Sequence, residues 1–256
     1  FNKRIQHRLE LALRMSKTVI ETIPILPFGM VNSFLIAFEG KAILIDTGLP
    51  QSEPKILKAL KKHSLVWSDV NAIVLTHAHI DHAGSAVAIK SLTSAPIIAH
   101  EMEIPYCQGE RPTLNATGLF GRLFYKTGAI LEPFPYFRPD VPIAQPKLNL
   151  SEYGFPMCTL HFTPGHTPGS LSVLFDDGRV IAGDLAASGI LLGGIAFRKR
   201  PKRPPFEESA ALVATSLEQL LALGARKFYI GHGGPLGAKT IDTHVHALRK
   251  ISPLPG

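Results

Sequence analysis

Residues 76–84 read THAHIDHAG and follow the apolar run AIVL at 72–75. The apolar, β-branched run predicts a short buried strand that ends where the histidines begin. A helix is predicted from about residue 84 through AVAIKSL at 86–92. A buried strand that leads through a polar turn into a helix is typical of α/β folds, which collect functional side chains at the ends of strands.

The same stretch holds four side chains that can bind a metal, namely His77, His79, Asp81 and His82. His77 and His79 are two positions apart, so an extended backbone would point both to one side. Asp81 and His82 follow in the turn before the helix. Imidazole and carboxylate groups without a thiolate suit zinc, iron or manganese. The stretch therefore predicts part of a metal site.

Three further candidate ligands stand in loops that follow predicted strands. His166 lies in TPGHTPGS at 163–170, Asp184 in IAGD at 181–184, and His232 in YIGHGG at 229–234. Proline and glycine leave these loops free to present a side chain, and glycine allows close approach of the backbone. Ligands at the ends of several strands would meet at one edge of the sheets. We therefore expect these three side chains to complete the cluster.

Strands and helices alternate along most of the chain. Strands are predicted at 18–26, 31–38, 41–46, 72–76, 96–100, 157–163, 171–175, 179–183 and 225–231, and the other helices at 52–63, 206–224 and 240–250. Residues 103–150 differ, because they are rich in proline and aromatic residues and show little periodicity. We expect a single domain of two similar halves over 18–256, with 103–150 as an insertion or lid and 1–17 as a basic N-terminal arm or helix.

Together these motifs resemble the metallo-β-lactamase-fold hydrolase superfamily, with LIDTG at 44–48 as its first motif. The resemblance implies an α/β fold in the form of a four-layer αββα sandwich with a metal site at one edge. It also implies that His77, His79 and His166 hold one metal. The second metal would be held by Asp81, His82 and His232. Asp184 would bridge the two ions, and Asp46 would orient a ligand.

The implied cofactors are two divalent metal ions per chain, with zinc expected and iron or manganese as the alternatives. The implied reaction is hydrolysis of a small ester, lactone, thioester or amide by a metal-bridging hydroxide, with Asp81 as the catalytic residue that shuttles the proton. The expected partner is a small-molecule substrate.

Several branches of the superfamily remain open as alternatives. An acyl-homoserine-lactone lactonase would keep all seven ligands, although DLAASGI at 184–190 lacks the tyrosine that those enzymes carry after the bridging aspartate. A β-lactamase of the third subclass shares the loop around His166 but usually lacks the bridging aspartate. A glutathione-thioester hydrolase would add a C-terminal domain, and a ribonuclease Z-type nuclease would add an arm. A mononuclear-iron persulfide dioxygenase would need only the first three histidines.

Aromatic residues of the 103–150 segment are candidates for the substrate pocket. We expect Tyr106, Phe134, Tyr136 and Phe137 to form an apolar wall. Phe197 and Arg198 are expected on the rim of the same pocket.

The net charge of +7 raises the question of a nucleic-acid partner. Residues 1–17 and RKRPKR at 198–203 together carry more positive charge than the whole chain, so the remainder is slightly acidic. Two local basic patches do not make a nucleic-acid surface, and we expect none. The apolar stretches are too short for a membrane span, and two distant cysteines favour a cytoplasmic protein, although a removed N-terminal signal is compatible with the sequence. A homodimer is also compatible with it.

Overall fold

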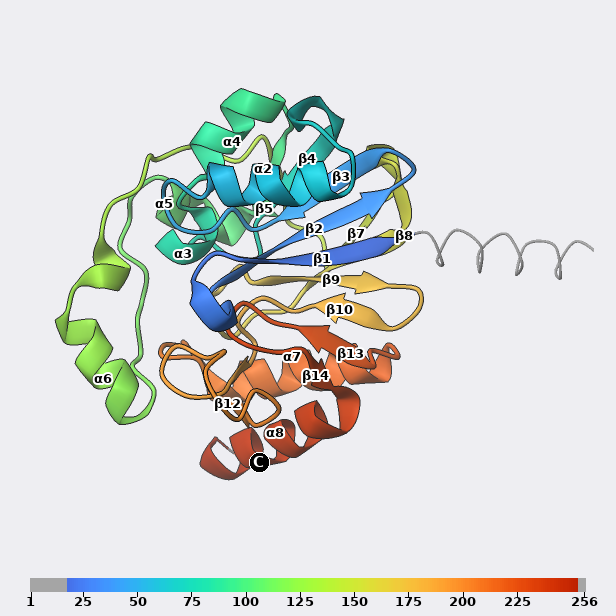
Figure 1. Cartoon of the computed structure of the whole chain (residues 1–256). Helices are drawn as coiled ribbons and strands as arrows, with labels where there is room; N and C mark the ends of the chain where they lie inside the picture. The colour runs from blue at the N-terminus through green and yellow to red at the C-terminus, as the bar shows by residue number, and fades with distance from the viewer. Residues whose placement is uncertain (1–17, 253–256) are drawn as a thin grey trace, which may run out of the picture.

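The computed structural model describes residues 18–252 and contains two six-stranded sheets packed face to face (Figure 1). The predicted arm at 1–17 lies outside the described residues. The first sheet has the order β1-β2-β3-β4-β5-β6, with its last four strands parallel. Its strands are β1 (Val19–Pro24), β2 (Asn32–Phe38), β3 (Lys41–Ile45), β4 (Val70–Val74), β5 (Ile97–His100) and β6 (Val141–Ile143).

The second sheet has the order β14-β13-β10-β9-β8-β7 and is mainly antiparallel, with β10 and β13 as its parallel pair. Its strands are β7 (Lys147–Leu150), β8 (Phe155–Phe162), β9 (Leu171–Phe175), β10 (Arg179–Ile181), β13 (Lys227–Tyr229) and β14 (Leu236–Gly237). A separate two-stranded ribbon joins β11 (Ala187–Ser188) to β12 (Pro201–Lys202).

Apolar residues on both faces of each sheet explain the layering. In β2, Phe34 and Ile36 face the second sheet, whereas Leu35 belongs to the cluster on the outer face. A strand buried on both faces is continuously apolar, as β2 is from Phe34 to Phe38. The outer face of the first sheet is covered by α2 (Glu53–Lys62) and α4 (Ala86–Thr93), and that of the second by α7 (Ala210–Ala222) and α8 (Ala238–Ile251). The expected αββα sandwich is confirmed.

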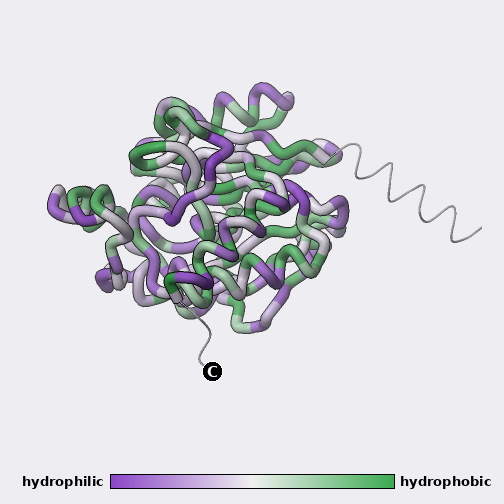
Figure 2. Tube along the Cα trace, turned by 90° about the horizontal axis from the view of Figure 1, so that it is seen from below, coloured by the Kyte–Doolittle hydropathy of each residue, from purple (hydrophilic) through white to green (hydrophobic). Residues whose placement is uncertain are grey.

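Residues 103–150 are more ordered than their sequence indicated. They contain the short helix α5 (Ile104–Cys107), the helix α6 (Gly118–Lys126) and the strands β6 and β7, which are edge strands of the two sheets. The part that stands outside both sheets is therefore shorter than predicted and ends before residue 141. Figure 1 shows α6 set apart from the sheets, and in Figure 2 the segment at the same side of the molecule projects from the rest of the tube.

One predicted helix boundary was wrong. Helix α7 begins at Ala210 rather than at residue 206, and the Ser209 side chain caps it by accepting a hydrogen bond from the backbone N–H of Leu212. The preceding residues are not helical because they bond elsewhere, as when Glu208 N–H donates to the Gly165 carbonyl. Within the part of the chain that the structure describes, we find no helix long and apolar enough to cross a membrane.

Candidate metal centre

All seven predicted ligands lie at one edge of the sandwich, each just beyond a strand. His77 and His79 follow β4, and His79 is the N-cap of the one-turn helix α3 (Ile80–Ala83), which carries Asp81 and His82. The loop between β8 and β9 carries His166. The other two are Asp184, after β10, and His232, after β13. Six of the seven are buried, and Asp81 is partly exposed.

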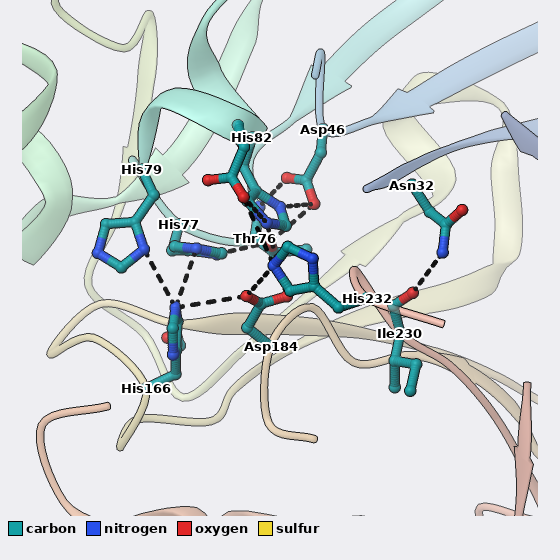
Figure 3. Close-up of polar contacts among 12 residues, drawn as sticks. Asn32, Asp46, Thr76, His77, His79, His82, His166, Asp184, Ile230 and His232 are labelled. Carbon is teal, nitrogen blue, oxygen red and sulfur yellow. Dashed lines mark hydrogen bonds and ion pairs between the residues drawn. The ribbon is translucent and has the colours of Figure 1, made fainter. Parts of the chain in front are cut away.

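Three imidazoles converge in the first part of the cluster. The Nε2 atom of His166 lies 3.1 Å from Nε2 of His77 and 3.2 Å from Nδ1 of His79 (Figure 3). Burial, together with the neighbouring imidazoles, holds the pKa of His77 well below its usual value. Burial likewise lowers the pKa of His79 and of His166 to about 3. All three rings are therefore neutral and have a nitrogen lone pair available.

The second part of the cluster combines imidazoles with carboxylates. Nε2 of His232 lies 3.5 Å from an Asp81 oxygen, and His82 lies 3.9 Å from the same oxygen. Burial alone would lower the pKa of His82, but the nearby carboxylates of Asp184, Asp46 and Asp81 outweigh it and raise the pKa to about 10. The carboxylates raise the pKa of His232 against its burial in the same way. This half of the cluster attracts positive charge.

Asp184 lies between the two groups. Its Oδ2 atom is 2.9 Å from Nε2 of His232 and 3.7 Å from Nε2 of His166, while Oδ1 is 3.5 Å from Nε2 of His82. Burial would raise its pKa, but the facing imidazoles of His232 and His82 hold it far below the usual range of a carboxyl. The ligand atoms form three mutually close sets: His77, His79, His166; His77, His82, Asp184; and Asp81, His82, His232.

Hydrogen bonds outside the cluster set the tautomer of two rings through Asp46. This carboxylate is fully buried and accepts from the Thr76 backbone N–H at 2.7 Å and the Thr76 hydroxyl at 2.8 Å. Its Oδ2 atom also accepts from Nδ1 of His82 at 2.8 Å. Because the Thr76 hydroxyl donates to Asp46, it accepts from Nδ1 of His77 at 3.0 Å. Both rings therefore turn an unprotonated Nε2 toward the interior in their neutral forms.

The ring of His232 is oriented by a backbone carbonyl. The loop that carries this ring is held by Asn32, a residue that the sequence pattern did not indicate. Nδ1 of His232 donates to the Met30 carbonyl at 2.5 Å. Asn32 is buried, and its amide donates to the carbonyls of Ile230 and Gly233 on either side of His232, each at 3.1 Å (Figure 3). Nothing in the local sequence marks Asn32, because its partners are remote in the chain.

Glu103 is the second site residue that the sequence did not single out. It stands in the short helix η3 (Glu101–Glu103) and is fully buried. It accepts hydrogen bonds from the loop that carries His77 and His79 and from the loop that carries His166.

Two cavities adjoin the cluster. A space of about 20 Å³ is bounded by the ligands and closed by apolar residues, among them Phe124 of α6, Leu192 and Phe206. Beside His79 lies a cavity of about 250 Å³ whose lining includes three of the predicted aromatic residues, Tyr106, Phe134 and Tyr136.

The other predicted pocket residues lie elsewhere. Phe137 does not line this cavity, because it packs against the core beneath the first sheet. Phe197 and Arg198 border a separate surface groove, and Arg198 donates to the Gly234 carbonyl in the loop of His232. A larger groove, of about 690 Å³, lies around the β9–β10 turn, away from the ligand loops.

A family model described as the metallo-beta-lactamase superfamily matches residues 26–232, from just after β1 to the last candidate ligand. The chain belongs to the metallo-β-lactamase superfamily. Probable metallo-hydrolase YflN of Bacillus subtilis is 31% identical over 217 residues, which is 80% of each chain. Probable metallo-hydrolase YqgX of the same organism is 27% identical, over 64% of this chain and 71% of its own.

The fold agrees with solved members of the superfamily. The crystal structure of BLEG-1 B3 metallo-beta-lactamase superposes with a TM-score of 0.66 at 22% identity and covers 90% of this chain and 99% of its own. The chain is a metal-dependent hydrolase of the superfamily, and its clustered histidines and aspartates are consistent with a metal site.

Proposed function

We propose that this metallo-β-lactamase-fold protein is a dinuclear zinc hydrolase that cleaves a small ester, lactone, thioester or amide. The observation that carries the proposal is the position of Asp184, whose two oxygens face both halves of the cluster. His77, His79 and His166 would hold one ion, and Asp81, His82 and His232 the other. Asp184 would bind both.

The donor set fits two divalent ions. The atoms His82 Nε2 and Asp184 Oδ1 are buried and have no hydrogen-bond partner within residues 18–252, as expected for atoms that face a cation. Neutral nitrogen and carboxylate oxygen without sulfur are ligands for zinc, with iron and manganese as alternatives. Two such ions, when bound, supply Lewis acidity and an activated water at neutral pH.

Asp81 is the residue that we assign to proton transfer. It is the one member of the cluster with appreciable exposure, its side chain being 15% accessible, and it borders the small cavity between the ligands. Its Oδ1 atom has no hydrogen-bond partner among the residues described. A carboxylate oxygen free of other donors can accept a proton from the nucleophile and pass it to the leaving group.

The cavities support a small substrate. The space between the ligands holds little more than the reacting atoms, because Phe124 and Phe206 close it. The neighbouring cavity would take the acyl group of the substrate against Ile130, Phe134 and Tyr136. The lining of this cavity also includes one cationic side chain, that of Arg111. This geometry favours a compact acyl compound over a polymer.

The test is a substrate panel with protein reconstituted separately with zinc, manganese and iron. Nitrophenyl esters, acyl lactones, acyl thioesters and a chromogenic β-lactam would be compared with the variant His79→Ala. We expect metal-dependent hydrolysis of at least one class, which is lost in the variant. Oxygen consumption with a persulfide, without any hydrolysis, would refute the proposal in favour of a mononuclear-iron dioxygenase.

A further inference from the structure

Glu103 is a buried carboxylate without a cationic partner. Its accessible surface is 0%, and no lysine, arginine or histidine within the described range lies at ion-pair distance from it. Burial raises its pKa to about 7, against the hydrogen bonds that lower it. A charge in this position costs stability unless hydrogen bonds offset the lost hydration.

The hydrogen bonds of Glu103 join two segments that belong to different sheets. Oε2 accepts from the backbone N–H of Ala78 at 2.8 Å. Oε1 accepts from the Thr167 hydroxyl at 2.7 Å and from the Gly169 N–H at 2.9 Å. Ala78 lies between His77 and His79, and Thr167 directly follows His166. One carboxylate thus holds the backbones that carry the three converging imidazoles.

The contact between Glu103 and the His166 loop requires that residue 169 has no side chain. A Cβ atom at Gly169 would lie 2.7 Å from both Cγ and Oε1 of Glu103, which is closer than real contacts allow. Any larger residue at 169 would displace the carboxylate. The loop TPGHTPGS is therefore shaped around Glu103 as well as around its histidine.

We propose that Glu103 is a positioning residue that sets the spacing of His77, His79 and His166, and thereby the affinity of this half of the site for metal. The inference rests on the proposed function. Three directional hydrogen bonds fix the distance between the two loops that carry these histidines. Nitrogen–zinc bonds tolerate little variation in length, so the spacing of the ligands decides affinity.

The effect is specific to one half of the site. The second half is held by other contacts, those of Asp46 with His82 and those of Met30 and Asn32 around His232. None of these involves Glu103. Loss of Glu103 therefore weakens the three-histidine half and leaves the other half intact.

The experiment is a Co²⁺ titration of metal-free protein, followed by the visible absorption of the ion and by elemental analysis. The variants are Glu103→Gln, Glu103→Ala and Gly169→Ala. Glu103→Gln keeps the shape of the side chain but turns an amide N–H toward a backbone donor. Leu60→Ala is the control, because Leu60 is fully buried in α2 and belongs to a core cluster that includes no residue of either loop. Thermal unfolding of each metal-free variant separates lost affinity from lost stability.

We expect each Glu103 variant to bind Co²⁺ at one site with a roughly 10–100-fold lower affinity and a changed absorption spectrum, while the other site stays as in the wild type. Gly169→Ala should change in the same direction. Leu60→Ala should keep both affinities despite its lower Tm. Unchanged binding in the Glu103 variants, or equal loss at both sites, would overturn the inference. A wild-type chain that bound no Co²⁺ would refute the proposed function itself, and the inference with it.

Discussion

Replacing Asp46 with asparagine tests how Asp46 sets the tautomer of the neutral His82 ring. Asp46 is fully buried and accepts three hydrogen bonds, two from Thr76 and one from Nδ1 of His82. In Asp46→Asn the new amide keeps one acceptor for the Thr76 N–H and turns its NH₂ toward His82. The ring must then accept through Nδ1 and carry its proton on Nε2. A protonated Nε2 cannot bind a metal.

The size of the effect follows from these contacts. Residues that orient a metal-binding histidine are worth about 10–100-fold in metal affinity, or about 1.4–2.7 kcal/mol. Replacing charged hydrogen bonds with neutral ones also lowers the free energy of unfolding of the metal-free protein by about 1 kcal/mol or more per bond. The loss of affinity should fall on both halves of the site, because the Oδ2 atom that is replaced accepts from His82 and also from the Thr76 hydroxyl that sets the tautomer of His77.

The assay is calorimetric titration of metal-free protein with Zn²⁺, beside denaturant unfolding of the same samples. Thr76→Ser is the matched control, because it keeps the hydroxyl that bonds to Asp46. We expect two binding events in the control and weakening of both events in Asp46→Asn. If Asp46→Asn bound two ions with wild-type affinity, the tautomer argument would be wrong.

Three further predictions follow from buried groups. Asn32→Ala should lower the free energy of unfolding by about 1–3 kcal/mol, because it leaves loop carbonyls without a donor. Denaturant titration would detect this loss, and a change below about 0.5 kcal/mol would contradict the prediction. Cys107 and Cys158 are buried, and burial raises the pKa of both thiols, that of Cys107 to about 12. Mass spectrometry should therefore find both cysteines unalkylated at pH 8 until denaturant is added. Alkylation of the native protein would count against this prediction. Burial lowers the pKa of His244 to about 4, so the stability that its neutral ring contributes is complete above pH 6.5 and is lost as the pH falls toward 4. Over that range the free energy of unfolding of metal-free His244→Leu should therefore fall by up to ~3 kcal/mol less than that of the wild type. The variant His246→Gln, which replaces an exposed histidine, is the control and should follow wild type. Identical curves of unfolding free energy against pH for all three proteins would refute the prediction.

Local pattern predicted an α/β domain and the members of the cluster, whereas the αββα sandwich was implied by the resemblance of the motifs to the superfamily. THAHIDHAG follows a buried strand, and short loops after strands bring His166, Asp184 and His232 to the same edge. These features depend on neighbours in sequence, because strand ends and turns are coded within a few residues. The two alternating apolar faces of β2 likewise follow from local periodicity.

What the sequence did not predict depends on contacts between remote residues. Glu103 and Asn32 act through hydrogen bonds to segments far along the chain, and a single glutamate or asparagine has no pattern of its own. The early residues of the predicted helix at 206–224 are not helical because Glu208 bonds to the Gly165 carbonyl in the His166 loop. Phe137 was assigned to the pocket by residue type alone, whereas in the structure it is partly buried and packs against the core cluster of the first sheet.

Elemental analysis of protein purified without added metal tests the central claim most directly. Wild type, Asp184→Asn and the control Asp176→Asn would be compared, because Asp176 is an exposed aspartate at the β9–β10 turn, distant from the cluster. A shared dinuclear site predicts about two zinc ions per chain in wild type and control, and a clear loss in Asp184→Asn. About one iron per chain, unchanged in Asp184→Asn, would contradict the dinuclear hydrolase.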